Sequence, residues 1–170
     1  VPSADLSSID PIAVSGYPIR NHGYMVYDTL YATDSEFRIR PQMAKGHEIS
    51  PDGLTWTFHL RDGLRFHDST PVLARDCVAS LRRWGARDGL GQALLALTND
   101  LTDIDDRSFR FRLKQPFPLM LDALGKAASP VPFIMPERIA VTPPTTQIRD
   151  ATGSGPFRFL PEQWVSDRHV

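Results

Sequence analysis

Several sets of residues in this 170-residue chain have side chains that could do chemistry. The most suggestive is Gly153-Ser154-Gly155, a serine between two glycines that looks like the nucleophile turn of a hydrolase. The nucleophile elbow has the pattern G-x-S-x-G, with glycines two residues before and two residues after the serine. Here Thr152 stands at the first of those positions, and Gly155 comes one residue too early. The spacing therefore does not favour a serine hydrolase.

Histidines and acidic residues supply the side chains that could bind a metal ion. His59 and His67 would share a polar face if residues 54–67 form a hairpin, as diagonal neighbours about 7–8 Å apart. A zinc site needs three or four converging ligands, and no cysteine, histidine or glutamate close in sequence completes the set. The acidic cluster within residues 103–106 lacks the glycine and the distal glutamate of a calcium loop. We therefore expect no metal site.

Nucleotides and nucleic acids are disfavoured by motif and by charge. Neither phosphate-binding pattern, G-x-x-x-x-G-K-[ST] or G-x-G-x-x-G, occurs in the chain. The 19 basic and 20 acidic residues give a formal charge of −1, whereas nucleic-acid surfaces need an excess of Lys and Arg. The arginines within residues 107–113 could bind an anion, but charged side chains on the solvated face of a strand are the commoner case. These results favour a binding or structural role over catalysis.

The elements that would position these residues are short, because 15 prolines interrupt the chain. Residues 1–23 contain prolines and glycines with little periodicity, and we expect them to be irregular. Between residues 24 and 31 the tyrosines recur at helical spacing, which predicts a short helix whose tyrosines belong to the core. The glycine turn at residues 153–155 is expected to lead into a short strand.

Residues 54–67 are predicted to form a β-hairpin, because polar and apolar residues alternate strictly in its first half. A three-residue loop with Gly63 in the left-handed conformation would set the register. That register pairs Leu60 with Leu64 and Phe58 with Phe66. It is favoured because it places all the apolar side chains of the hairpin on one buried face.

Downstream of the hairpin, an amphipathic helix is predicted over residues 74–85 and a strand over residues 107–113. Cys77 lies on the apolar side of this helix, so we expect a small buried hydrophobe rather than a reactive thiol. Further short helices are expected over residues 91–99 and 119–124. The sequence therefore predicts a mixed α/β fold.

A series of short motifs runs along nearly the whole chain. They are Ile9-Asp10-Pro11, Tyr27-Asp28-Thr29-Leu30, Pro41-Gln42-Met43-Ala44, the run from Ser50 to Asp68, Pro71-Val72, Asp76-Cys77-Val78, Phe111-Arg112-Leu113, Pro116-Phe117-Pro118 and Gly153-Ser154-Gly155-Pro156-Phe157. In this order they resemble the N-terminal part of a family 5 extracellular solute-binding protein, the peptide-type receptor of bacterial ABC importers.

The resemblance implies an α/β fold like that of the type II periplasmic binding proteins, of which this chain would form only the N-terminal part. Residues 1–29 and 153–170 would belong to the first lobe, and residues 30–152 would form a small extra domain beside it. The second lobe, which supplies most ligand-anchoring groups in the family, would follow Val170.

The resemblance also implies a function. Such receptors are not enzymes and use no cofactor; they close on a peptide or a related small solute and hand it to ABC permease subunits in the membrane. The full-length protein would be periplasmic or lipid-anchored, with a signal peptide that this chain does not contain. Nucleic acid is not an expected partner.

Carried over to this sequence, the resemblance implies that the stretch after Asp10-Pro11 lines the ligand cleft, at Ser15, Gly16, Tyr17, Pro18 and Ile19. Gly16 would allow close approach of the backbone, and Tyr17 would offer an aromatic wall with one polar tip. Some peptide receptors of the family place an acidic residue at the position of Ser15, where it would pair with the α-amino group of a peptide. The serine here argues against recognition of an ammonium group at this position.

Two other classes of function stay open from the sequence. The ligand-sensing module of a transcriptional regulator can carry the same kind of lobe, and a DNA-binding helix-turn-helix before Val1 would indicate it. A metal- or serine-dependent hydrolase would need a catalytic constellation that the sequence does not display. Peptidase activity abolished by Ser154→Ala would favour that class.

Overall fold

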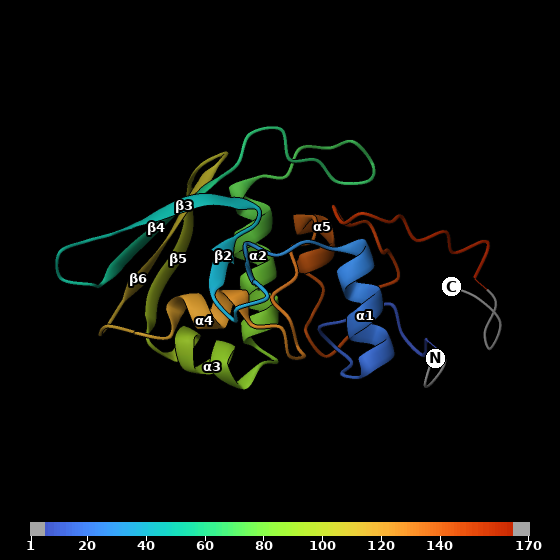
Figure 1. Cartoon of the computed structure of the whole chain (residues 1–170), viewed down its shortest axis with the longest axis horizontal. Helices are drawn as coiled ribbons and strands as arrows, with labels where there is room; N and C mark the ends of the chain where they lie inside the picture. The colour runs from blue at the N-terminus through green and yellow to red at the C-terminus, as the bar shows by residue number, and fades with distance from the viewer. Residues whose placement is uncertain (1–5, 165–170) are drawn as a thin grey trace.

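Helices and strands are interspersed along the chain, as Figure 1 shows. The structure, a computed structural model, describes residues 6–164. Its elements are α1 (Tyr17–Val26), β1 (Tyr31–Thr33), β2 (Ile39–Pro41), β3 (Ala44–Ile49), β4 (Thr55–Leu60), α2 (Ala74–Gly85), α3 (Gly89–Ala96), β5 (Thr98–Asp105), β6 (Ser108–Leu113), α4 (Met120–Gly125) and α5 (Glu137–Ala140). The prediction of a mixed helix and strand fold is confirmed.

The main sheet is antiparallel, with the strand order β3-β4-β6-β5, and α2 and α3 pack against it (Figure 1). Because β4 and β6 alternate polar and apolar residues, each strand buries one face. Phe58, Phe109 and Phe111 are fully buried on that face. Helix α2 repeats its apolar residues at helical spacing, so Leu81 and Trp84 enter the same core.

Several elements follow the sequence expectations. Helix α2 has the predicted bounds, β6 occupies the predicted strand, and α4 begins one residue later than expected. Cys77 is fully buried on the inner side of α2, as predicted, and burial raises the pKa of its thiol. Among the described residues, no helix combines the length and the apolar character needed to cross a membrane.

The predicted hairpin over residues 54–67 is wrong in its second half. Strand β4 pairs with β3 on one side and with β6 on the other, so neither edge of β4 is free for residues 64–67. Gly63 does adopt the predicted left-handed conformation, with φ of 76°, and Phe66 is buried without joining the sheet. The long-range pairing prevails because β6 adds its own phenylalanines to the buried face, which a local hairpin cannot do.

The helix predicted over residues 24–31 is also wrong, because α1 lies earlier, in the segment expected to be irregular. Pro18 in the first turn favours this start, since its fixed φ suits a helix and its missing N–H is not needed there. The extended backbone of Tyr27, with φ of −119°, ends the helix. Tyr27 and Tyr31 are core residues as expected, whereas Tyr24 is 39 % exposed.

Strands β3 and β5 are absent from the sequence prediction. Strand β5 begins inside the helix predicted over residues 91–99, which ends earlier, as α3. Most of the acidic cluster within residues 103–106 lies in β5, which ends at Asp105. The pairing with β6 places Asp100 opposite Arg112, so opposite charges meet across the two strands.

The glycine turn at residues 153–155 does not lead into a strand. It instead packs against the C-terminal end of α1, where a Cβ on Gly153 would meet the carbonyl oxygen of Val26 at 1.9 Å. The N–H of Gly155 donates to that oxygen at 2.9 Å, and the N–H of Phe157 donates to the carbonyl of Met25 at 2.9 Å. A side chain at position 153 would break this contact.

The turn between β1 and β2 holds a bulky residue in a strained conformation. Phe37 has φ of 59° and is 88 % exposed, so no packing compensates for the left-handed backbone. The carboxylate of Asp34 fixes the turn by accepting the N–H groups of Glu36 and Arg38, each at 2.9 Å. The turn is therefore well defined, although phenylalanine does not favour the left-handed conformation that position 37 requires.

We expect Phe37→Asn to raise the free energy of unfolding by about 1 kcal/mol, because asparagine adopts the left-handed conformation more readily than phenylalanine. Urea unfolding of the two proteins measures the change. Phe37→Ala is the matched control, since it removes the ring but keeps the Cβ that causes the strain. A gain from alanine equal to that from asparagine would contradict the explanation.

Candidate functional site

The residues predicted to face a ligand lie at the start of α1. Ser15 and Tyr17 are exposed, the latter by 71 %, and Gly16 and Pro18 are partly exposed. Ile19 is only 4 % exposed, so its side chain anchors the helix and offers a ligand no surface. The structure brings the first four of these residues together on one accessible stretch of chain.

This stretch has a specific chemical character. The guanidinium of Arg20 lies over the ring of Tyr17, 5.0 Å from its centroid, which is a cation–π arrangement. No acidic residue lies in the first turn of α1, and Gly16 at its N-cap has no side chain to cap it. The stretch therefore offers an aromatic face, a hydroxyl and a positive charge, which suit hydrogen bonding and stacking.

A tight turn directly before Ser15 sets the path of this stretch. The carboxylate of Asp10 accepts the N–H groups of Ile12 at 3.1 Å and Ala13 at 3.0 Å. The N–H of Val14 donates to the backbone carbonyl of Asp10 at 3.2 Å. The turn over residues 10–14 therefore ends where the candidate ligand-facing residues begin.

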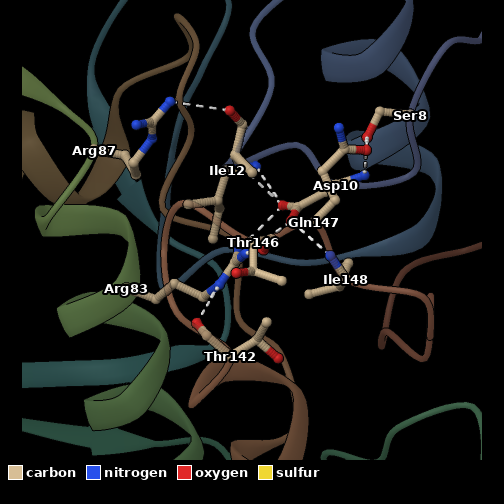
Figure 2. Close-up of polar contacts among 10 residues, drawn as sticks. Ser8, Asp10, Ile12, Arg83, Arg87, Thr142, Thr146, Gln147 and Ile148 are labelled. Atoms are coloured by element: carbon tan, nitrogen blue, oxygen red, sulfur yellow. Dashed lines mark hydrogen bonds and ion pairs between the residues drawn. The ribbon is translucent and has the colours of Figure 1, made fainter.

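A buried ion pair holds this turn against α2, as Figure 2 shows. Two nitrogens of the Arg83 guanidinium donate to the two carboxylate oxygens of Asp10, at 3.0 and 2.7 Å. The remaining guanidinium bonds go to the carbonyls of Thr142 at 3.1 Å and Thr146 at 3.0 Å. The N–H of Ile148 donates to Asp10 at 3.0 Å. One ion pair thus joins the N-terminal turn, α2 and the loop after α5.

Both partners of this pair are almost inaccessible to water, with 0 % exposure for Asp10 and 3 % for Arg83. Burial by itself would raise the pKa of Asp10, but the hydrogen bonds from Arg83, Ala13 and Ile148 and the charge of Arg83 outweigh it. The pKa of Asp10 is therefore lowered below its usual value. The carboxylate stays ionised and keeps its partner at neutral pH.

The serine at 154 is not placed for nucleophilic catalysis. The Nε2 of His67 lies 2.9 Å from the carbonyl of Gly155, and its Nδ1 accepts the N–H of Gly153 at 3.4 Å. Because both ring nitrogens contact the backbone, His67 is not available as a base, and the hydroxyl of Ser154 is buried without bonding to it. The histidine fixes the glycine turn.

The other side chains that were considered for binding a metal ion or an anion have other partners. His59 bonds through Nδ1 to the hydroxyl of Ser108 at 3.1 Å, on the outer face of the sheet. Arg107, directly before β6, pairs with Asp62, and Arg112 lies opposite Asp100 of β5, so these two arginines face opposite charges. In the part of the chain that the structure describes, no three His, Cys, Asp or Glu side chains gather to hold a metal ion.

Arg83 is a site residue that the sequence does not identify. An arginine is expected on the polar face of an amphipathic helix, whereas the structure buries Arg83. The signal that could have found it is Asp10, a charged residue in an otherwise apolar segment, which requires a buried partner. The separation of 73 residues gives no local pattern by which to choose that partner.

Comparison with known proteins gives matches over most of the chain. Residues 38–170 match the family described as bacterial extracellular solute-binding proteins, family 5 middle. The chain is 44 % identical, over 155 residues, to a probable peptide ABC transporter periplasmic-binding protein of Sinorhizobium fredii. That match covers 91 % of this chain and 29 % of the relative, so the chain spans less than a third of the relative's length.

Solved structures resemble the fold as well. The periplasmic binding protein AgaA of Agrobacterium tumefaciens R10, in complex with agropinic acid, matches with a TM-score of 0.74 and 29 % identity, over 96 % of this chain and 32 % of that one. OppA of Haemophilus influenzae, in complex with the peptide RPPGFSPFR, matches with a TM-score of 0.65 and 25 % identity, over 80 % of this chain and 30 % of that one. The expected fold, the N-terminal part of a type II periplasmic binding protein, is confirmed.

We expect Arg83→Met to lower the free energy of unfolding by about 3–5 kcal/mol, because it leaves the buried Asp10 carboxylate without a partner. Urea unfolding measures the loss. The double variant Asp10→Asn/Arg83→Met removes the stranded charge and should recover part of it. Arg138→Met is the matched control, since Arg138 pairs with Asp68 at the surface, where an ion pair contributes about 1 kcal/mol or less. Equal losses in both single variants would contradict the special role of the buried pair.

The lowered pKa of Asp10 predicts a contribution to acid sensitivity. A carboxylate whose pKa is depressed in the folded state adds stability above its unfolded pKa, near 3.8, and loses it as the pH falls through the folded value. Urea unfolding between about pH 5 and pH 2 should therefore show a smaller loss of stability in Asp10→Asn than in the parent protein. Parallel pH profiles for the two proteins would refute the prediction.

Proposed function

Because the chain belongs to family 5 of the bacterial extracellular solute-binding proteins, we propose that it is part of the substrate-binding component of an ABC importer. In this role the whole protein binds a peptide or a related small solute in a cleft between two lobes and delivers it to a membrane permease. It acts by binding and not by catalysis. The observation that carries the proposal is the family match over residues 38–170 together with the 44 % identity to the peptide-transporter relative.

We propose that the ligand-facing wall of this chain is formed by Ser15, Gly16, Tyr17 and Pro18, with Ile19 as its buried anchor. The exposure of Tyr17 and the partial exposure of its neighbours support this placement. Since Ser15 carries no charge and Arg20 lies beside Tyr17, this wall is suited to the polar backbone or an acidic group of a ligand and not to an ammonium group.

We also propose that residues 1–29 and 153–170 belong to the first lobe, and that residues 30–152 form a small domain beside it. The backbone hydrogen bonds from residues 155 and 157 to the end of α1 support the grouping of the two outer pieces. Apart from Tyr17, which we assign to the wall, these pieces also carry exposed apolar side chains: Tyr24, Met25, Phe157, Leu160 and Trp164. Such a surface is suited to packing against further parts of a lobe.

Because the matched family is described as extracellular, we propose a periplasmic or lipid-anchored location for the whole protein. A permease of the ABC type is the proposed partner, and no nucleic acid is required. A transcriptional regulator that carries the same lobe would instead show a DNA-binding segment ahead of residue 1.

The first test compares this chain with the longer protein. Calorimetric titration with a synthetic tetrapeptide library should show binding by a protein that extends to the length of the relatives and no tight binding by residues 1–170 alone. Enclosure from two sides is what offsets the entropy lost on association. Micromolar binding by the shorter chain would contradict the two-lobed cleft, and no binding by the longer protein would contradict the peptide receptor.

The second test concerns the proposed wall. In the longer protein, Tyr17→Ala should weaken peptide binding by roughly tenfold, which corresponds to about 1.4 kcal/mol, while leaving the free energy of unfolding nearly unchanged, because the ring is exposed. Phe37→Ala, which removes an exposed aromatic ring elsewhere, is the control and should leave the affinity unchanged. Equal affinity in the parent and Tyr17→Ala would exclude Tyr17 from the site.

A further inference from the structure

The corner between α2 and α3 touches the proposed wall at a point outside the buried ion pair. The guanidinium of Arg87, two residues after the end of α2, donates to the carbonyl of Ala13 at 3.1 Å. Ala13 lies in the turn that ends directly before Ser15. An exposed arginine of the proposed small domain thus bonds to the backbone that leads into the proposed wall.

The corner that carries Arg87 is rigid. The N–H groups of Arg87 and Asp88 both donate to the carbonyl of Trp84, at 2.9 and 3.0 Å. The buried carboxylate of Asp88 caps α3 by accepting two N–H groups and pairs with Lys126. The two helices approach so closely here that a Cβ on Gly91 would meet the Cα of Gly85 at 2.7 Å. The backbone position of Arg87 is therefore fixed independently of the contacts that its side chain makes.

Arg83 and Arg87 bond to opposite ends of the turn over residues 10–14. Arg83 holds the side chain of Asp10 at the start of the turn, and Arg87 holds the carbonyl of Ala13 near its end. The Asp10 carboxylate already bonds to the N–H of Ala13, and the bond from Arg87 to the carbonyl of Ala13 adds a direct contact between this end of the turn and the corner after α2. The direction of the turn sets where Ser15 and Tyr17 point.

We propose that Arg87 is a positioning residue, through which the small domain braces the stretch from Ala13 to Tyr17 and so sets the affinity of the proposed wall for its ligand. This inference rests on the proposed function for its effect on affinity. Its mechanical part, the bracing of residues 13–17, is independent of the ligand. The small domain thereby contributes to binding without having to touch the ligand.

The test uses the longer protein with Arg87→Gln, and Arg82→Gln as the matched control. Arg82 is also exposed and also bonds to a carbonyl, that of Leu101 at 2.7 Å, but on β5. We expect Arg87→Gln to speed amide exchange at Ala13 and Val14, whose N–H groups bond to Asp10, and to weaken binding of the best tetrapeptide of a synthetic library roughly fivefold, with an unchanged melting temperature. Arg87→Lys keeps a donor and should restore part of the affinity.

The outcomes are distinguishable. Unchanged amide exchange in Arg87→Gln overturns the brace, and so do equal effects of Arg82→Gln and Arg87→Gln. Faster exchange with unchanged peptide affinity overturns the proposed effect on binding while the peptide receptor stands. If the parent binds no peptide at all, the proposed function fails, and faster exchange confined to Arg87→Gln still supports the brace.

Discussion

The structure depends most on the burial of one pair of opposite charges. Placing Asp10 and Arg83 out of water carries a large desolvation cost, which their bidentate contact and the surrounding backbone groups must offset. Those groups come from three separate parts of the chain, so the pair is satisfied only when the N-terminal turn, α2 and the loop after α5 meet. The ion pair therefore favours this arrangement of the parts, because separating the partners while one of them stays buried leaves a charge without a partner.

A second set of contacts joins the glycine turn at residues 153–155 to the C-terminal end of α1. The glycine turn at residues 153–155 fits against Val26 only because it lacks side chains at both ends, and His67 bonds to the backbone of the same turn. Helix α1 is thus held at its C-terminal end by the glycine turn, and the turn that precedes its N-terminal end is held by Asp10 and Arg83. A short helix fixed at both ends can present an exposed tyrosine in a constant direction, as the proposed wall requires.

These contacts show that the buried polar groups of the described chain have strict requirements for partners. The buried polar groups serve to position the backbone: both ring nitrogens of His67 contact the backbone of the glycine turn. A rigid wall favours tight binding, because any conformational entropy that the proposed wall loses on association lowers the affinity for the ligand. The proposed small domain fits this requirement through α2, whose C-terminal end holds the turn before the wall.

The sequence by itself determined the elements with strong local periodicity, α2 and β6, the burial of Cys77 and the left-handed turn at Gly63, since each follows from neighbouring residues. Its ordered motifs also determined the family. Only the tertiary structure decided which strands flank β4 and where α1 begins. It also decided that Arg83 is buried and pairs with Asp10. In these cases the deciding energy comes from residues far apart in the chain, which bury aromatic rings or neutralise a charge together, and no local pattern records such a pairing.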